Sequence, residues 1–157
     1  MRLTLGAVLA LALVLGACGE KEKEHEEKGE AREEHSELSA FELENGIGPV
    51  KEKIELGTLN RALADSGKAL FEAKCSMCHK MDTTYVGPAL GEVTARRTPA
   101  YIMNMILNPQ EMVERHPVAK QLLAERMTFM ANQNLKLEEA RAVLEYLRTQ
   151  AKNAPKP

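Results

Sequence analysis

The sequence predicts an all-α fold, and three observations lead to it. Apolar side chains near the C-terminus recur at the spacing of one helix face, as Leu137, Ala140, Leu144 and Leu147. Three prolines stand where helices would begin, at Pro99, Pro109 and Pro117. The chain has no run of alternating apolar and polar residues, the pattern of a half-buried strand. Its 157 residues are also few enough to favour one domain.

Residues 1–17 are predicted to be a lipoprotein signal peptide. After Arg2 an apolar, uncharged run extends to Ala17, and it is shorter than the about 20 residues of a membrane-spanning helix. Such an N-terminal run is typical of a secretory signal peptide. Its end, Leu15-Gly16-Ala17-Cys18, resembles the lipobox of bacterial lipoproteins, whose cysteine is acylated and becomes the new N-terminus. The alternative is an ordinary signal peptide followed by an unrelated cysteine.

Residues 18–40 are expected to be the acylated Cys18 and a disordered charged tether. Residues 19–40 hold nine Glu against four Lys or Arg, and so polar a segment cannot bury enough apolar surface to offset its chain entropy. Two or more acyl chains give stable attachment to lipid. We therefore expect the protein to be lipid-anchored on a bacterial cell membrane, on the periplasmic or outer side. An acidic tail that docks to a partner is the alternative.

Residues 41–157 are predicted to form one domain of nearly balanced charge. Residues 38–157 hold 16 Lys and Arg against 14 Asp and Glu, and no basic stripe for nucleic acid emerges from them. The balance also indicates no particular charge on a partner. We expect this domain to be a monomer.

The elements of this domain follow from local signals. Glycines and a proline among scattered apolar residues predict an irregular segment from Phe41 to Leu59. Helical signals begin at Asp65-Ser66 and lead into Cys75. The three proline-started helices follow, the first of them capped by Thr98. The final helix has acidic residues in its first turn and Arg148 in its last, as the helix dipole favours.

The motif Cys75-Ser76-Met77-Cys78-His79 indicates the chemistry of the chain. Two thiols at this spacing can form thioethers to the two vinyl groups of one porphyrin, and the adjacent imidazole can then reach the iron. A zinc site would need further ligands, and the sequence has no second cysteine pair or His-x-His cluster. A redox dithiol explains neither the histidine nor the missing βαβ pattern. The motif therefore predicts one haem c, attached at Cys75 and Cys78, with His79 as an axial iron ligand.

The residues around this motif resemble those of class I (monohaem) cytochromes c. The ring nitrogen of His79 that does not face the iron carries a proton and needs a hydrogen-bond acceptor. In this family the carbonyl of a proline in a Gly-Pro-x-Leu segment accepts that hydrogen bond. The resemblance implies this role for Pro88. The family also places a glycine and an aromatic residue where the N-terminal helix crosses the C-terminal one, and Gly67, Phe71 and Tyr146 match this arrangement. The resemblance implies the class I cytochrome c fold around one covalently bound haem, with an irregular N-terminal extension and extra helices before the methionine ligand.

A methionine is the expected second axial ligand, because the family places one in a short loop before the C-terminal helix. Met130 has that position, although the proline that usually follows is absent, and Met127 is the alternative. Methionines inside helices are more often core residues, and these are Met103, Met105 and Met112. His116 is interpreted as a surface turn at a helix start rather than as a ligand.

Three side chains are candidates to pair with the haem propionates, with solvent-exposed groups as the alternative interpretation; they are Tyr85, Arg96 and Arg97.

Histidine and methionine together raise the potential of a haem relative to two histidines. They also fill its coordination sphere, which suits electron transfer and not enzymatic chemistry. With its expected anchor, the chain resembles lipid-anchored respiratory-chain cytochromes c, which pass electrons from a quinol-oxidising complex to a terminal oxidase, a haem–copper oxygen reductase. The alternatives are a donor to another periplasmic reductase, a dedicated subunit of one complex, and a haem-based sensor or peroxidase with a labile methionine.

Overall fold

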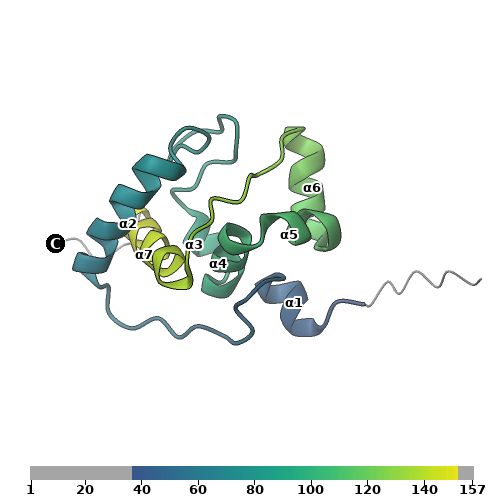
Figure 1. Ribbon diagram of the computed structural model, residues 1–157, viewed down its shortest axis with the longest axis horizontal. Coiled ribbons are helices and arrows are strands. Elements are labelled where there is room, and N and C mark those ends of the chain that lie inside the picture. Colours follow the sequence, from purple (N-terminus) through teal and green to yellow (C-terminus); the bar gives the residue numbers. More distant parts are fainter. Residues whose placement is uncertain (1–36, 152–157) are drawn as a thin grey trace, which may run out of the picture. The chain divides into compact units, whose positions relative to one another are not determined.

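The computed structural model describes residues 37–151, and within this range the fold is all-α, as predicted. Figure 1 shows its seven helices, which are α1 (Ala40–Asn45), α2 (Arg61–Lys74), α3 (Val93–Arg96), α4 (Pro99–Leu107), α5 (Pro109–Arg115), α6 (Pro117–Arg126) and α7 (Leu137–Gln150). The predicted signal peptide, Cys18 and most of the predicted tether lie outside the described residues. None of the helices in residues 37–151 is long and apolar enough to cross a membrane.

Helix α1 lies where the sequence was expected to be irregular, so that prediction is wrong for the residues from Phe41 to Asn45. The helix begins with a capping box: the Glu42 amide donates to Ser39 Oγ at 3.2 Å, and the Ser39 amide donates to the Glu42 carboxylate at 3.0 Å. This Ser-x-x-Glu signal is present in the sequence but was not recognised. Residues 46–59 contain no helix or strand, as predicted.

The segment after α1 is fixed to the domain by Asn104 of α4, which is fully buried. Its Nδ2 donates to the carbonyls of Asn45 and Val50, each at 3.0 Å, and its Oδ1 accepts from the Val50 amide at 2.9 Å. A Cβ atom on Gly48 would collide with the Asn104 side chain, so only glycine allows this close approach. The N-terminal extension is therefore an integral part of the folded domain.

His116 lies in the interior, and its interpretation as a surface turn is wrong. The residue is 0% exposed, and its Nε2 donates to the Leu43 carbonyl at 3.1 Å. Its ring meets the Tyr101 ring edge-on, with 5.3 Å between centroids. Burial lowers the pKa of His116 and so favours the neutral ring. The burial arises because α1 packs over this histidine, a long-range contact that no local sequence signal reports.

Helices α2 and α7 cross in close contact, as the positions of Gly67 and Phe71 predict. A Cβ atom on Gly67 would collide with the backbone carbonyl of Ala142, so the two backbones touch at this point. The Phe71 and Tyr146 rings lie beside the crossing, with 5.3 Å between their centroids. This crossing sets the position of the residues that follow α2.

The predicted helix starts are largely confirmed. The three proline-started helices begin at the predicted residues, and Thr98 Oγ1 accepts from the Tyr101 amide at 3.1 Å. Helix α2 begins at Arg61 rather than at Asp65, because the Asn60 side chain caps it with a 3.0 Å backbone hydrogen bond. Helix α3 was not predicted, since four residues are too few to show a periodic pattern.

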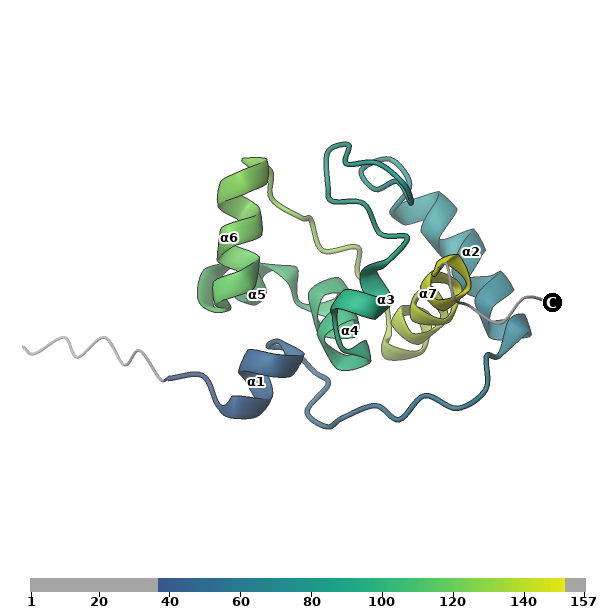
Figure 2. The same ribbon diagram turned by 180° about the vertical axis from the view of Figure 1, so that it is seen from behind.

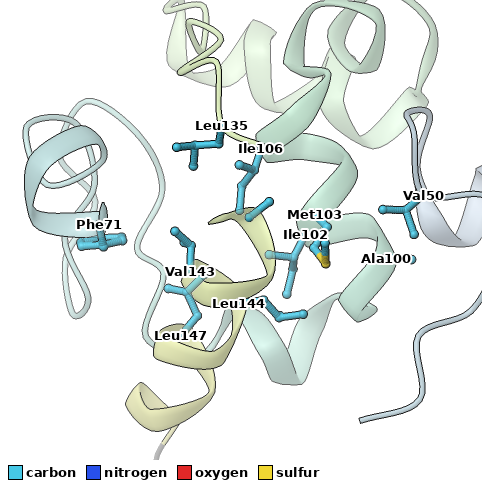
Figure 3. Close-up of a cluster of buried hydrophobic side chains, with 11 residues drawn as sticks. Val50, Phe71, Ala100, Ile102, Met103, Ile106, Leu135, Val143, Leu144 and Leu147 are labelled. Atoms are coloured by element: carbon cyan, nitrogen blue, oxygen red, sulfur yellow. The ribbon is translucent and has the colours of Figure 1, made fainter. Parts of the chain in front are cut away.

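The main core lies between α4 and α7, and Figure 3 shows the side chains that fill it. Ile102 and Ile106 of α4 face Val143 and Leu144 of α7. Phe71 joins the cluster from α2, and Val50 and Leu135 join it from the connecting segments. The core thereby holds α2, α4 and α7 in a fixed arrangement.

The buried carboxylate of Glu145 holds the segment that precedes α2 against helix α7. It accepts hydrogen bonds from Arg141 at 2.7 Å, from Arg148 at 2.8 Å and from the Asn60 amide at 3.3 Å. Burial opposes its ionisation, but the hydrogen bonds from the two arginines outweigh burial and lower the pKa of Glu145. Arg148 also donates to the Gly57 carbonyl at 2.8 Å.

Candidate functional site

The Cys75–His79 motif forms one compact turn at the end of α2. The Cys75 carbonyl accepts from the Cys78 amide at 3.1 Å and from the His79 amide at 2.9 Å. Cys75 is half-buried and Cys78 is exposed, and burial raises the pKa of the Cys75 thiol. The turn brings both thiols and the imidazole to the wall of a single cavity.

The orientation of His79 is set by the segment Gly87-Pro88. His79 Nδ1 lies 3.0 Å from the Pro88 carbonyl oxygen, and because a carbonyl can only accept, Nδ1 carries the proton and Nε2 the lone pair. A Cβ atom on Gly87 would collide with the imidazole ring, so glycine lets the backbone lie against the ring. The Gly87 amide donates to the Cys78 carbonyl at 2.8 Å. This arrangement leaves Nε2 as the nitrogen able to bind a metal ion.

The cavity beside this turn has a volume of about 310 Å³ and mostly apolar walls. Figures 1 and 2 show α2 and α6 on opposite sides of the domain, with residues 127–136 running from α6 across to α7. Both sides contribute to the lining, together with α4 and α7. An apolar concavity with a few polar groups is the usual form of a cofactor site. Within residues 37–151 the charged lining residues are all cationic, and they are Lys74, Arg96, Arg97 and Arg126.

Met130 lines the same cavity as His79, from the segment between α6 and α7. The neighbouring Asn132 ties this segment to the domain by donating from Nδ2 to the Leu107 carbonyl at 3.2 Å. Met127 ends α6 with a φ of 52°. Its side chain is 86% exposed and is not among the described residues that line the cavity. The two candidate methionines therefore have different surroundings.

The other methionines and His116 divide between the core and the cavity. Met103 and Met112 are buried core residues, as predicted for methionines in helices. Met105 is only partly buried and lines the cavity from α4. His116 is absent from the described lining, since its ring is held between Tyr101 and α1.

Of the three proposed propionate partners, Arg96 and Arg97 line the cavity and Tyr85 does not. Tyr85 is 62% exposed, with the Lys80 ammonium 5.4 Å from its ring centroid. Sequence reasoning missed Tyr101 and Arg126, which do line the cavity. For Arg126 a signal existed, because helical spacing places it on the same face as three apolar residues that also line the cavity, Ala119, Leu122 and Leu123.

The residues at this site fit a covalently attached haem. Two thiols, an oriented imidazole and a thioether border an apolar cavity, and the charged residues in the described part of its lining are all basic. In residues 37–151, no three His, Cys, Asp or Glu side chains gather where they could hold a metal ion together. The zinc alternative therefore has no ligand set in this range.

An all-α domain whose Cys-x-x-Cys-His turn borders an apolar cavity has the architecture of a c-type cytochrome. Residues 64–151 match the family described as Cytochrome c. This chain belongs to the cytochrome c family.

Solved structures and curated sequences of cytochromes c resemble this chain. Cytochrome c from Rhodothermus marinus is 50% identical, with a TM-score of 0.67 over 71% of this chain and 97% of that one. An engineered cytochrome c from the same organism, bound to a carbene intermediate, has the same identity and coverage and a TM-score of 0.65. A cytochrome c-553-like protein of Synechocystis sp. is 34% identical over 64 residues, 32% of this chain and 61% of the relative. Cytochrome c-551 of Stutzerimonas stutzeri is 58% identical over 36 residues, 22% of this chain and 35% of the relative. The chain thus matches less than two thirds of the length of either curated relative.

Membership in this family confirms several predictions. The fold is that of a monohaem class I cytochrome c, and the cofactor is one covalently bound haem c. The family to which the chain belongs consists of electron-transfer proteins.

Proposed function

We propose that this protein is a lipid-anchored electron carrier of a respiratory chain, which takes single electrons from a quinol-oxidising complex and delivers them to a terminal oxidase. One observation carries the assignment of a closed electron-transfer site: His79 and Met130 line one cavity, so each could supply a ligand to the iron of a haem bound there. The anchor, the donor and the acceptor are supported by the lipobox-like sequence before Cys18 and by resemblance to lipid-anchored respiratory cytochromes c.

In this proposal each residue of the site has a distinct role. Cys75 and Cys78 would hold the haem by thioethers, and His79 Nε2 and Met130 Sδ would ligate its iron. When bound, the haem supplies a reversible one-electron iron couple. Pro88 keeps His79 in the required tautomer through the 3.0 Å contact to Nδ1. Met130 would supply a soft thioether ligand, which favours ferrous iron.

Membrane attachment should depend on the first eighteen residues. Replacing residues 1–18 with a conventional, fully cleaved signal peptide is expected to move the holoprotein to the periplasmic fraction, because the acyl chains on Cys18 would be lost. Cell fractionation followed by haem staining measures the distribution, and the chain with its own leader is the control. Mass spectrometry of the membrane form should also show an acylated Cys18. If the protein with the replaced signal peptide stayed attached to the membrane, a lipid anchor at Cys18 would be contradicted.

The proposed partners can be tested with membranes from cells that produce the protein. Reduced protein mixed with these membranes is expected to be reoxidised by oxygen in a cyanide-sensitive reaction, since haem–copper oxidases would accept its electrons. The reaction is followed by the loss of the ferrous haem absorbance, and protein without membranes is the control. Reoxidation that requires the substrate of another reductase would favour that reductase as the partner. Binding of carbon monoxide by the native protein at neutral pH would favour a sensor or peroxidase.

A further inference from the structure

Two buried polar atoms on the cavity side of the domain have unmet hydrogen-bonding capacity. Tyr101 Oη and Arg126 Nε have no hydrogen-bond partner among the described residues, and both residues line the haem cavity. Tyr101 belongs to α4 and is 5% exposed, and Arg126 is the last residue of α6. The third such atom is Nδ1 of His116, which lies outside the described lining. Buried donors are nearly always paired in native proteins, so these two donors point to a ligand that accepts from both.

The charge of the cavity identifies the kind of acceptor. All four charged lining residues are cations, and no described carboxylate faces them in the lining. Three of them already have contacts: Lys74 donates to the Gln133 carbonyl at 3.3 Å, Arg96 donates to the Ala89 carbonyl at 2.9 Å, and the Arg97 guanidinium lies 5.2 Å from the Tyr101 ring centroid. A cationic, partly apolar wall with unpaired donors suits a carboxylate, because charge-assisted hydrogen bonds are the stronger kind.

Helix α6 presents its residues in an order that fits an apolar ring with an anionic substituent. Its cavity-lining face runs from Ala119 through Leu122 and Leu123 to Arg126, at the spacing of one helix face. Figure 1 shows α6 on the opposite side of the domain from the turn after α2 that carries Cys75 and Cys78. The apolar residues of α6 and Arg126 at its end therefore border the same cavity as Cys75 and Cys78, which lie on the opposite side of that cavity.

We propose that Tyr101 Oη and Arg126 Nε donate hydrogen bonds to a propionate carboxylate of the haem, so that α6 closes the propionate edge of the site. The inference rests on the proposed haem attachment at Cys75 and Cys78. Burial raises the pKa of Tyr101, and the Arg97 guanidinium only partly opposes this, so the phenol keeps the proton it donates at neutral pH. The two donors act as positioning residues for the haem and keep that propionate ionised.

The tyrosine can be tested with a matched pair of conservative variants. Tyr101→Phe in the holoprotein is expected to shift the propionate bending mode in the resonance Raman spectrum to lower frequency, because a hydrogen bond to the carboxylate is lost. Tyr85→Phe removes the same hydroxyl from an exposed residue that is absent from the described lining, and should leave the mode unchanged. Far-UV circular dichroism and the Soret band establish that both variants are folded with haem bound.

The arginine can be tested against a lysine on the same helix. Arg126→Gln is expected to shift the same Raman mode and to lower the reduction potential more than Lys120→Gln, an equal change in net charge at an exposed residue of α6 outside the described cavity lining. Arg126→Lys should restore part of the potential but not the Raman frequency, because it returns the charge without Nε. An unchanged propionate mode in both Tyr101→Phe and Arg126→Gln would overturn the proposal. If the proposed haem attachment itself were wrong, the unchanged protein and all variants would lack covalently bound haem.

Discussion

Met130→Ala is expected to abolish the sulfur-to-iron charge-transfer band of the oxidised protein and to lower its reduction potential. Met130 lines the haem cavity, and its thioether stabilises ferrous iron in the proposed site. A fall on the order of 0.1 V is expected, a fraction of the roughly 0.8 V over which axial ligands set haem potentials. Visible absorption spectroscopy and a redox titration of the holoprotein measure the two effects. The variant should also bind carbon monoxide, because one axial position becomes accessible.

Met127→Ala and Met105→Ala are the matched controls for this ligand assignment. Met127 is exposed and outside the described lining, and its loss should leave both the band and the potential nearly unchanged. Met105 lines the cavity from α4, so its replacement tests contact with the cavity separately from ligation. The assignment of Met130 as the ligand would be wrong if Met130→Ala kept the charge-transfer band and either control variant lost it.

Gly67→Ala is expected to destabilise the protein, by about 3 kcal/mol, at the upper end of the roughly 1–3 kcal/mol typical of overpacking. Alanine in a helix interior normally stabilises relative to glycine by about 1 kcal/mol, so the sign of the change is diagnostic. The added Cβ would collide with the Ala142 carbonyl of α7, and backbone atoms cannot move aside as the end of a flexible side chain can. Guanidinium unfolding of the holoprotein, followed by far-UV circular dichroism, measures the change in the free energy of unfolding.

Gly57→Ala is the control for the helix crossing. A Cβ atom on Gly57 would have no neighbour within 4 Å, and the Gly57 carbonyl would still accept from Arg148. Its effect should stay within about 0.5 kcal/mol, as for most surface substitutions. If Gly67→Ala proved as neutral as Gly57→Ala, the two helices would have to separate more easily than their backbone contact indicates.

The parts of the fold that the sequence predicts are those determined by local signals. The prolines at helix starts, the Thr98 cap and the periodic face of α7 depend on neighbouring residues, and all were predicted correctly. His116 and Asn104 show the limit of this approach. Each is buried through contacts with the segment around α1, far away in the sequence. A polar residue gives no local indication that a distant carbonyl will satisfy it inside the core.

The site divides in a similar way. The spacing of Cys75, Cys78 and His79 indicates a covalent haem because all three groups act on one cofactor from one turn. Tyr101 and Arg126 reach the cavity from separate helices, so no short motif contains them. Tyr85 is a predicted candidate for pairing with a propionate, yet it is exposed and outside the described lining.

The hydrogen bonds of Asn104 have a mechanical consequence for the proposed lipid-anchored protein. Thermal motion of a tethered domain would produce tension at the point where the tether joins the folded domain, and here this point is α1. Figures 1 and 2 show α1 on the opposite side of the domain from the turn that follows α2. Tension applied at α1 meets the side chains of Asn104 and His116, which hold the adjoining backbone to α4 and α5. In the proposed lipid-anchored protein these contacts would therefore carry the tension, and the spacing of the proposed iron ligands would stay the same while the domain moves at the membrane surface.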